Sequence, residues 1–133
     1  MPRYDGPDLY HYTNLAGING ILKSGVIKST KVSLQKISCN DVTIGPGVYL
    51  TSLDPFNYTK EEILLNNYGT VKGFEDKADF YVKLSKAHIQ RDFDNGQLLY
   101  KSDTYPNVYV LQDKNDQMEE KLWNRLGYHF DEN

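Results

Sequence analysis

The sequence predicts an α+β fold, and three observations support this prediction. Short segments rich in β-branched and aromatic residues recur along the chain, as in "LYHYT" and "DFYVKLS". Other segments carry apolar residues at helical spacing between capping signals. Strands and helices do not alternate regularly, and neither GxGxxG nor GxxxxGK[ST] occurs, so a Rossmann or P-loop domain is excluded.

The bulk composition is that of a globular protein. The 133 residues are expected to form a single domain, 1–133, and they are 39% hydrophobic and 25% charged. A net charge of -3 gives no electrostatic footprint for DNA or an anionic membrane. The one cysteine, Cys39, excludes an intramolecular disulfide. No apolar run approaches the roughly 20 residues of a membrane span, and we expect a cytoplasmic site of action.

Two helices are predicted in the first half of the chain from their capping residues. Asn14 is a good N-cap for the first, and Gly25 is expected to end it in a left-handed conformation. Thr59 and Glu62 have the spacing of a capping box at the start of the second, which Gly69 is expected to end. Both helices should therefore be short and sharply bounded.

Extended segments surround these helices. In "ADFYVKLS" the residues Phe80, Val82 and Leu84 alternate with Tyr81 and Lys83, which predicts a strand with two different faces. A last helix is expected over 116–127, where Asp116 and Glu119 could cap an apolar stripe. The predicted extended segments are 8–13, 26–34, 48–52, 78–85, 96–102 and 107–113.

His11 is the first residue that could carry chemistry. It lies within a strand between Tyr10 and Tyr12, so alternation directs it to the opposite face from both, either into the core or into a cleft. His88 and His129 are expected to be ordinary surface groups. Because the histidines are far apart and have no carboxylate at ligand spacing, no metal site is predicted.

A second unusual feature is "GPGVYLTSLDP", in which Gly45, Pro46 and Gly47 precede Tyr49. Glycine permits close backbone approach and proline stiffens the turn. The segment is either a hairpin or bulge that leads into a buried strand, or the entry to a slot in which a flat ligand lies against Tyr49. Tyr58 could then frame the other side, because two aromatic rings can sandwich a planar group.

The order "LYHYT", "ILKSG", "VIKS", "GPGVYLTSLDP", "DFYVKLS" and "NVYVLQD" resembles the ADP-ribosyltransferase superfamily. It is most similar to the small toxin-type branch named for its histidine, tyrosine and aspartate. It resembles more loosely the catalytic domain of the poly(ADP-ribose) polymerases. The resemblance covers residues 8 to about 113 and implies a split β-sandwich of short antiparallel or mixed strands with a few short helices.

The resemblance also implies a set of site residues. His11 would bind a ribose hydroxyl of NAD, Tyr49 would stack on the nicotinamide ring, and Tyr58 is the candidate for its other side. Backbone groups of Tyr12 or Thr13 would hold the carboxamide. The implied NAD-binding set is completed by Gly47, Thr51 and Asn107.

The chain departs from the family at the acid. Polymerase-like relatives carry a glutamate at the start of the strand that here reads "NVYVLQD", where this chain has Asn107 or Val108. Cleavage of the nicotinamide–ribose bond builds positive charge on the sugar, so a nearby carboxylate is expected to help. Asp103 is the favoured catalytic residue beside His11 and Tyr49, and the alternatives are Asp113 and Asp54.

The implied activity is transfer of ADP-ribose from NAD, as co-substrate and without a metal, to a protein or nucleic-acid acceptor. Such a domain would act as a toxin or defence effector, with an immunity or antitoxin protein as a partner and no membrane. The alternatives are an NAD glycohydrolase, or an inactive module that binds NAD or ADP-ribose. A further option, transfer of an RNA 2′-phosphate to NAD, would need basic residues, and Lys28, Lys31 and Lys36 form the one obvious group.

Overall fold

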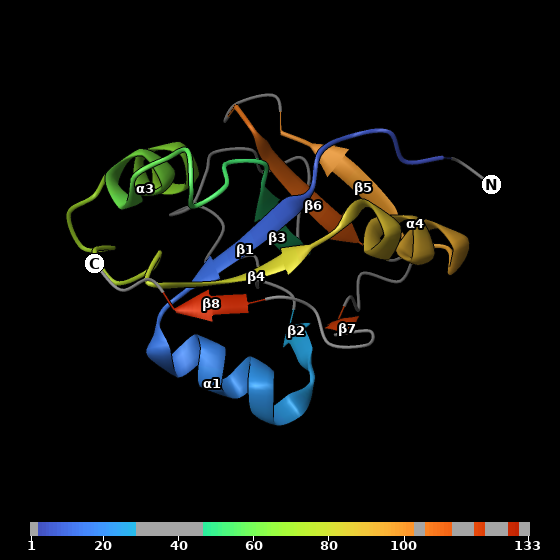
Figure 1. Cartoon of the computed structure of the whole chain (residues 1–133), viewed down its shortest axis with the longest axis horizontal. Helices are drawn as coiled ribbons and strands as arrows, with labels where there is room; N and C mark the ends of the chain where they lie inside the picture. Colours follow the sequence, from blue (N-terminus) through green and yellow to red (C-terminus); the bar gives the residue numbers. More distant parts are fainter. Residues whose placement is uncertain (1–2, 29–46, 103–105, 113–118, 122–127, 131–133) are drawn as a thin grey trace.

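A computed structural model of the chain describes residues 3–28, 47–102, 106–112, 119–121 and 128–130 (Figure 1). These residues form eight strands and three helices. The strands are β1 (Leu9–Thr13), β2 (Val26–Lys28), β3 (Val48–Thr51), β4 (Phe80–Leu84), β5 (Leu98–Lys101), β6 (Val108–Gln112), β7 (Glu119–Lys121) and β8 (Tyr128–Phe130). The helices are α1 (Leu15–Ser24), α3 (Lys60–Tyr68) and α4 (Lys86–Asp94). The predicted α+β class is confirmed.

Six strands form the main sheet, in the order β5-β6-β3-β1-β4-β8, and all neighbours in it are antiparallel. β2 and β7 form a separate two-stranded sheet. In the main sheet β1 and β4 are paired at five positions, whereas β1 and β3 are paired within the described residues only at Tyr10↔Thr51. Whether this sheet is part of a split sandwich stays a prediction.

Helix α1 begins and ends as its sequence predicts. The Asn14 side chain accepts a hydrogen bond from the Gly17 amide at 2.9 Å, which satisfies one of the free amides of the first turn. Gly25 has a φ of 78°, and its amide donates to the Ile21 carbonyl at 2.8 Å. A left-handed residue at this point favours glycine, so the helix ends here.

Helix α3 carries the predicted capping box. The Thr59 side chain accepts from the Glu62 amide at 3.1 Å, and the Glu62 carboxylate accepts from the Thr59 amide at 2.8 Å. Gly69 ends the helix with a φ of 77°. These contacts fix α3 directly after the turn that follows β3.

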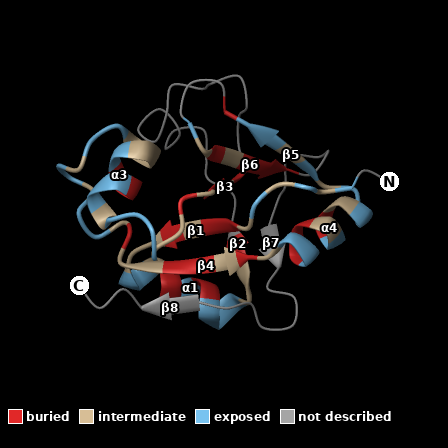
Figure 2. Cartoon of the chain, turned by 45° about the horizontal axis from the view of Figure 1, so that its top comes forward, coloured by how far each residue is buried: buried red, intermediate tan, exposed pale blue. Residues whose placement is uncertain are grey.

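The hydrophobic core lies on both faces of the sheet, and Figure 2 shows the central strands buried between exposed outer surfaces. Ile18 and Ile21 of α1 and Ile89 of α4 pack on one face, which we call the α1 face. Ile63 and Leu64 of α3 pack on the other, the α3 face. The α1 face also holds Leu9, Val48, Leu50, Val82 and Leu84, whereas the α3 face holds Tyr10, Tyr12, Leu53 and Tyr81.

Two predictions about helices are wrong. The residues 119–121, predicted as part of a helix, form strand β7, because Glu119–Lys121 pair with Val26–Lys28 of β2. Residues 86–94, for which no helix was predicted, form α4, whose N-cap Ser85 accepts from the His88 amide. A long-range strand pair overrides the local helical spacing in the first case.

The expectation of a surface position for His88 is also wrong. The side chain is buried, 4% exposed, because α4 packs against the α1 face and turns His88 and Asp92 inward. His129 lies in β8. Several residues named above lie outside the described part of the chain: Lys31, Lys36, Cys39, Gly45, Pro46, Asp103, Asp113 and most of 116–127.

Candidate functional site

A cleft of about 300 Å³ lies between β1, α1 and β2, on the α1 face of the sheet. His11 and Thr13 of β1 form one wall, since alternation directs both side chains toward α1. The helix contributes the opposite wall, and β2 contributes Val26 and Ile27. None of the described lining residues carries a charged side chain apart from His11 when it is protonated, so the cleft suits an uncharged group.

The ring of His11 is held by a hydrogen bond to the neighbouring strand. Its Nδ1 lies 3.0 Å from the carbonyl oxygen of Tyr49. Because a carbonyl oxygen only accepts, Nδ1 carries the proton and donates, which leaves Nε2 as the acceptor of the neutral ring. Burial lowers the pKa of His11 from its ordinary value of 6.5, and the bond to Tyr49 opposes this shift. The ring is therefore neutral at pH 7 and presents an acceptor in the cleft wall.

His11 lies at an opening of the sheet, which we call the β1–β3 seam. After the pair Tyr10↔Thr51, no further pair joins β1 to β3 in the described chain, although β1 continues to Thr13 and β3 begins at Val48. At this level a side chain replaces the backbone ladder, since the imidazole of His11 bonds the Tyr49 carbonyl. The seam therefore brings the predicted histidine and the backbone of the predicted tyrosine together.

The side chain of Tyr49 is directed away from the cleft. Val48 and Leu50 belong to the α1 face, so Tyr49 and Thr51 project to the α3 face. The position of Thr51 agrees, because its Oγ1 lies 3.4 Å from Nδ2 of Asn66 in α3. The rings of His11 and Tyr49 thus lie on opposite sides of the sheet, next to one seam.

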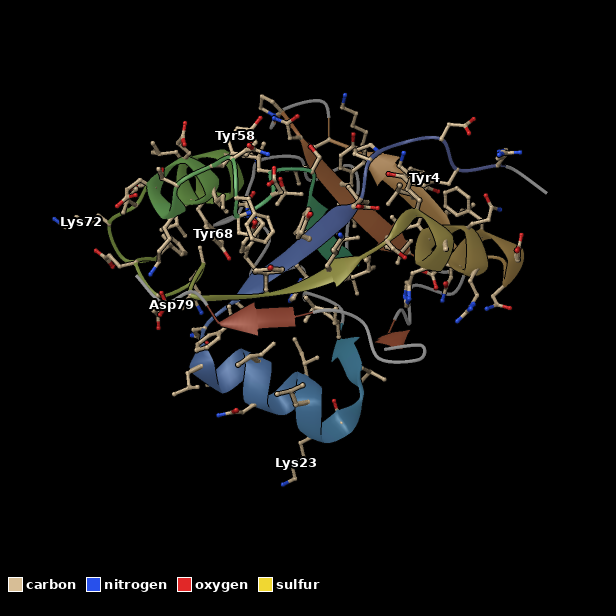
Figure 3. All side chains as sticks on the ribbon, viewed as in Figure 1. Tyr4, Lys23, Tyr58, Tyr68, Lys72 and Asp79 are labelled. Atoms are coloured by element: carbon tan, nitrogen blue, oxygen red, sulfur yellow. The ribbon has the colours of Figure 1, made fainter. Side chains whose placement is uncertain are left out.

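The other aromatic candidates also lie on the α3 side. Tyr12 is buried and donates from its hydroxyl to the Leu53 carbonyl at 2.7 Å, within a cluster that includes Tyr10 and Tyr81. Tyr58 directly precedes the N-cap of α3 and is 40% exposed. Figure 3 places it at the α3 end of the molecule, far from Lys23 at the end of α1. The structure thus separates Tyr58 from the cleft that His11 lines.

Gly47 is required by the packing of β3 on β6. A Cβ atom at this position would lie 2.4 Å from Cγ1 of Val110 and 2.9 Å from the carbonyl oxygen of Leu111. Both distances are below any ordinary contact, so only glycine lets the backbones approach this closely. Gly47 thereby fixes the start of β3, two residues before the carbonyl that holds His11.

The acidic candidates are only partly described. Asp54 accepts from the amides of Phe56 and Asn57 at 3.1 and 3.2 Å, which is the geometry of a turn-forming aspartate. Asn107 has a φ of 64°, and its carbonyl accepts from the Ser52 amide at 3.1 Å. Val108, the other residue at the position where the resemblance to the poly(ADP-ribose) polymerases implies a glutamate, is 4% exposed and lies opposite Thr51. No carboxylate stands at that position.

Sequence reasoning missed the helix wall of the cleft. Gly17, Gly20 and Ser24 of α1 line it, together with Val26 and Ile27 of β2. A signal was present in "LAGINGILKS", since two glycines inside a predicted helix are unfavourable and invite a packing or functional explanation.

Comparison with known proteins identifies the class. Residues 9–92 match the model of the Tox-ART-HYD1 family, described as "HYD1 signature containing ADP-ribosyltransferase". The match covers more than half of the chain and both strands of the seam, so the chain belongs to this ADP-ribosyltransferase-containing toxin family. The resemblance found in the sequence is confirmed. Searches of curated proteins and of solved structures gave no significant match.

Two further findings concern metals and membranes. The described residues contain no group of three or more His, Cys, Asp or Glu side chains arranged to hold a metal ion. None of the helices in the described ranges has both the length and the apolar character needed to cross a bilayer.

Proposed function

We propose that this chain is an NAD-dependent ADP-ribosyltransferase, which moves ADP-ribose from NAD to a protein or nucleic-acid acceptor and releases nicotinamide. It would act as a toxin or defence effector in a cytoplasm, with an immunity or antitoxin protein as a further partner. The observation that carries the proposal is His11, a neutral histidine fixed at Nδ1 by the Tyr49 carbonyl in the wall of the cleft. Its Nε2 is suited to accept a bond from a ribose hydroxyl.

The seam would allow His11 and Tyr49 to contact the same NAD molecule from opposite faces of the sheet. NAD carries two nucleoside halves joined by a pyrophosphate, so one molecule could place one half on each face of the sheet at the seam. One half would lie in the cleft against His11. The nicotinamide would lie on the α3 side, near the ring of Tyr49 and the start of α3, where Tyr58 is exposed. In this arrangement the seam is the split of the predicted sandwich.

The chemistry required of the protein is mainly orientation. Loss of nicotinamide leaves positive character on the ribose to which it was bonded. By holding the ribose of the other half in the cleft, His11 would fix the pose of NAD so that the reacting sugar is oriented for attack by the acceptor. A carboxylate near the sugar would stabilise that charge, and Asp103 stays the proposed residue. The backbone of Tyr12 or Thr13 at the seam would hold the carboxamide, with Gly47, Thr51 and Asn107 nearby in the proposed set.

Two alternatives differ in their outcome on NAD. An NAD glycohydrolase would use the same cleft with water as the acceptor. An inactive module that binds NAD or ADP-ribose is favoured by one observation, the buried Val108 where relatives have their glutamate.

The test is incubation with biotin-labelled NAD and a cell lysate, following labelled bands and free nicotinamide. His11→Asn is the informative variant, because its Nδ2 replaces the Nδ1 donor to Tyr49 while the Nε2 acceptor is lost. Lys83→Ala is the matched control, because Lys83 lies on β4, the neighbour of β1 on the side away from the seam.

Label on a protein or RNA band that is lost in His11→Asn and kept in Lys83→Ala would support the transferase. Nicotinamide release without label would indicate a hydrolase. A folded protein that gives neither signal but binds NAD would be a binding module, and Asp103→Ala tests the proposed acid in the same assay.

A further inference from the structure

Helix α1 has two glycines in its interior, Gly17 and Gly20. Glycine destabilises the interior of a helix relative to alanine, because it loses more backbone freedom on folding. In neither does the backbone adopt the left-handed conformation that would favour glycine. Each glycine therefore needs an explanation from its surroundings.

The surroundings explain Gly17. A Cβ atom there would lie 1.9 Å from Oγ1 and 3.1 Å from Cβ of Thr13 on β1. A side chain here would force Thr13 to move, so glycine allows α1 to pack closely against the end of β1. Gly17 is a structural residue.

The surroundings do not explain Gly20. Apart from its chain neighbours and the backbone of α1 itself, no atom of the described residues lies within 4 Å of a Cβ atom built here, so alanine or a larger residue fits against this part of the structure. Gly20 lies in the wall of the cleft that His11 and Thr13 line from β1. Its effect is to leave the backbone of α1 bare where this residue lines the cleft.

We propose that Gly20 is a specificity-determining residue, at which a nucleoside half of NAD lies directly against the α1 backbone while His11 holds its ribose. This inference rests on the proposed use of NAD. The cleft volume of about 300 Å³ is at the lower end of the range for small-molecule sites, which fits one nucleoside and not the whole dinucleotide. The described lining residues, which carry no charge while His11 is neutral, fit a base and ribose better than the pyrophosphate.

The test is the affinity for a carbocyclic NAD analogue that cannot be cleaved, measured by calorimetry on Gly20→Ala and Gly20→Leu. Leucine would occupy the space of the ligand, so we expect binding to weaken at least about tenfold, with a smaller loss for alanine. Asn19→Leu is the matched control, because it adds the same side chain to an exposed neighbouring position of α1 outside the cleft and should bind as the unchanged protein does. All three variants should keep or raise the melting temperature, since each replaces a weaker helix former.

Two fragments identify which nucleoside lies in the cleft. ADP-ribose lacks nicotinamide, and nicotinamide mononucleotide lacks adenosine. The proposed function puts the adenosine half in the cleft, so Gly20→Leu should weaken the binding of ADP-ribose and leave that of nicotinamide mononucleotide unchanged. The reverse result would keep the role of Gly20 and exchange the positions of the two halves.

Two results would overturn it, and they differ. If the unchanged protein binds the analogue and Gly20→Leu binds it equally well, Gly20 has no part in recognition while the use of NAD stands. If the unchanged, folded protein binds no analogue and uses no NAD, the proposed function fails, and the inference fails with it.

Discussion

Strand β1 has two neighbours in the sheet and meets them in different ways. With β4 it forms five successive residue pairs, from Leu9↔Leu84 to Thr13↔Phe80. With β3 it forms one pair in the described chain, Tyr10↔Thr51, and beyond it the contact is a side-chain bond from His11 to the Tyr49 carbonyl. A continuous ladder contributes stability, whereas the seam is where we propose that NAD binds. Changes on the β4 side should therefore alter stability, and changes at the seam should alter NAD use.

The largest effect is expected on the β4 side. Leu84 is fully buried and lies opposite Leu9. Leu84→Ala removes buried apolar surface and leaves a cavity, so the free energy of unfolding should fall by about 2–5 kcal/mol. Urea denaturation measures this. A fall in the free energy of unfolding of less than about 1 kcal/mol would show that packing on the β4 side of β1 does not stabilise the fold.

Gly47→Ala should have the next largest effect. The added methyl group meets Val110 and the Leu111 carbonyl, so β3 must move away from β6 at a cost of about 1–3 kcal/mol. The displacement should also disturb the bond from His11 to Tyr49, which the ¹⁵N shifts of the imidazole report. The double variant Gly47→Ala/Val110→Ala should lose less stability than the sum of the two single variants, because truncation of Val110 removes one of the two clashes with the added methyl group. The clash with the Leu111 carbonyl remains, so the relief should be partial. Unchanged ¹⁵N shifts of the His11 imidazole would show that Gly47 does not influence the bond from His11 to Tyr49.

The pH dependence of stability tests the seam itself. Burial lowers the pKa of His11 below its ordinary value of 6.5, so between these two values the unfolded chain binds more protons than the folded one. Stability should be complete above pH 6.5 and should fall as the pH drops toward the lowered pKa. His11→Asn should make this fall shallower in thermal melts from pH 7.5 to 5.

His88 is the comparison residue for that measurement. Burial lowers its pKa as well, with Asp92 opposing the shift, so part of the fall should persist in His11→Asn. The fall in stability at low pH should be smaller still in the double variant His11→Asn/His88→Asn. An identical pH profile for His11→Asn and the unchanged protein would contradict the neutral, buried state of His11.

The smallest effect is expected for a charged pair on the β4 side. Lys83 Nζ lies 3.5 Å from Asp8 Oδ2, and both side chains are partly exposed. Such pairs contribute about 0–1 kcal/mol, so Lys83→Ala should change the free energy of unfolding by less than 1 kcal/mol. A larger, salt-sensitive loss of unfolding free energy would mean that this ion pair stabilises the pairing of β1 with β4.

Local features of the fold could be predicted from the sequence, because their signals lie within a few residues of each other. The cap at Asn14, the left-handed Gly25 and the capping box of Thr59 and Glu62 are examples. Helix α4 could have been predicted from Ser85 and the spacing of Ile89 and Phe93, and was missed.

The site was predictable only in part, since it depends on which strands become neighbours. Alternation correctly placed His11 opposite Tyr10 and Tyr12, because that rule acts within one strand. The face of Tyr49 depends on the register of β3 against β1 and β6, which no local pattern contains. The strand at Glu119–Lys121 was not predicted for the same reason, since it pairs with residues 26–28, which are distant in the sequence.

The position of β6 has a consequence for how this protein is made. β3 ends at Thr51, and β6, which begins only at Val108, is its partner on the side away from β1. While the chain is being synthesised, β1, β3 and β4 emerge first, and one edge of β3 has no strand to pair with until β6 appears. Contacts between such distant residues form late and limit the rate of folding. The Tyr49 carbonyl that orients His11 belongs to β3, which is paired on that edge only when β6 is present. The site should therefore be completed only after residue 112, the end of β6, has left the ribosome.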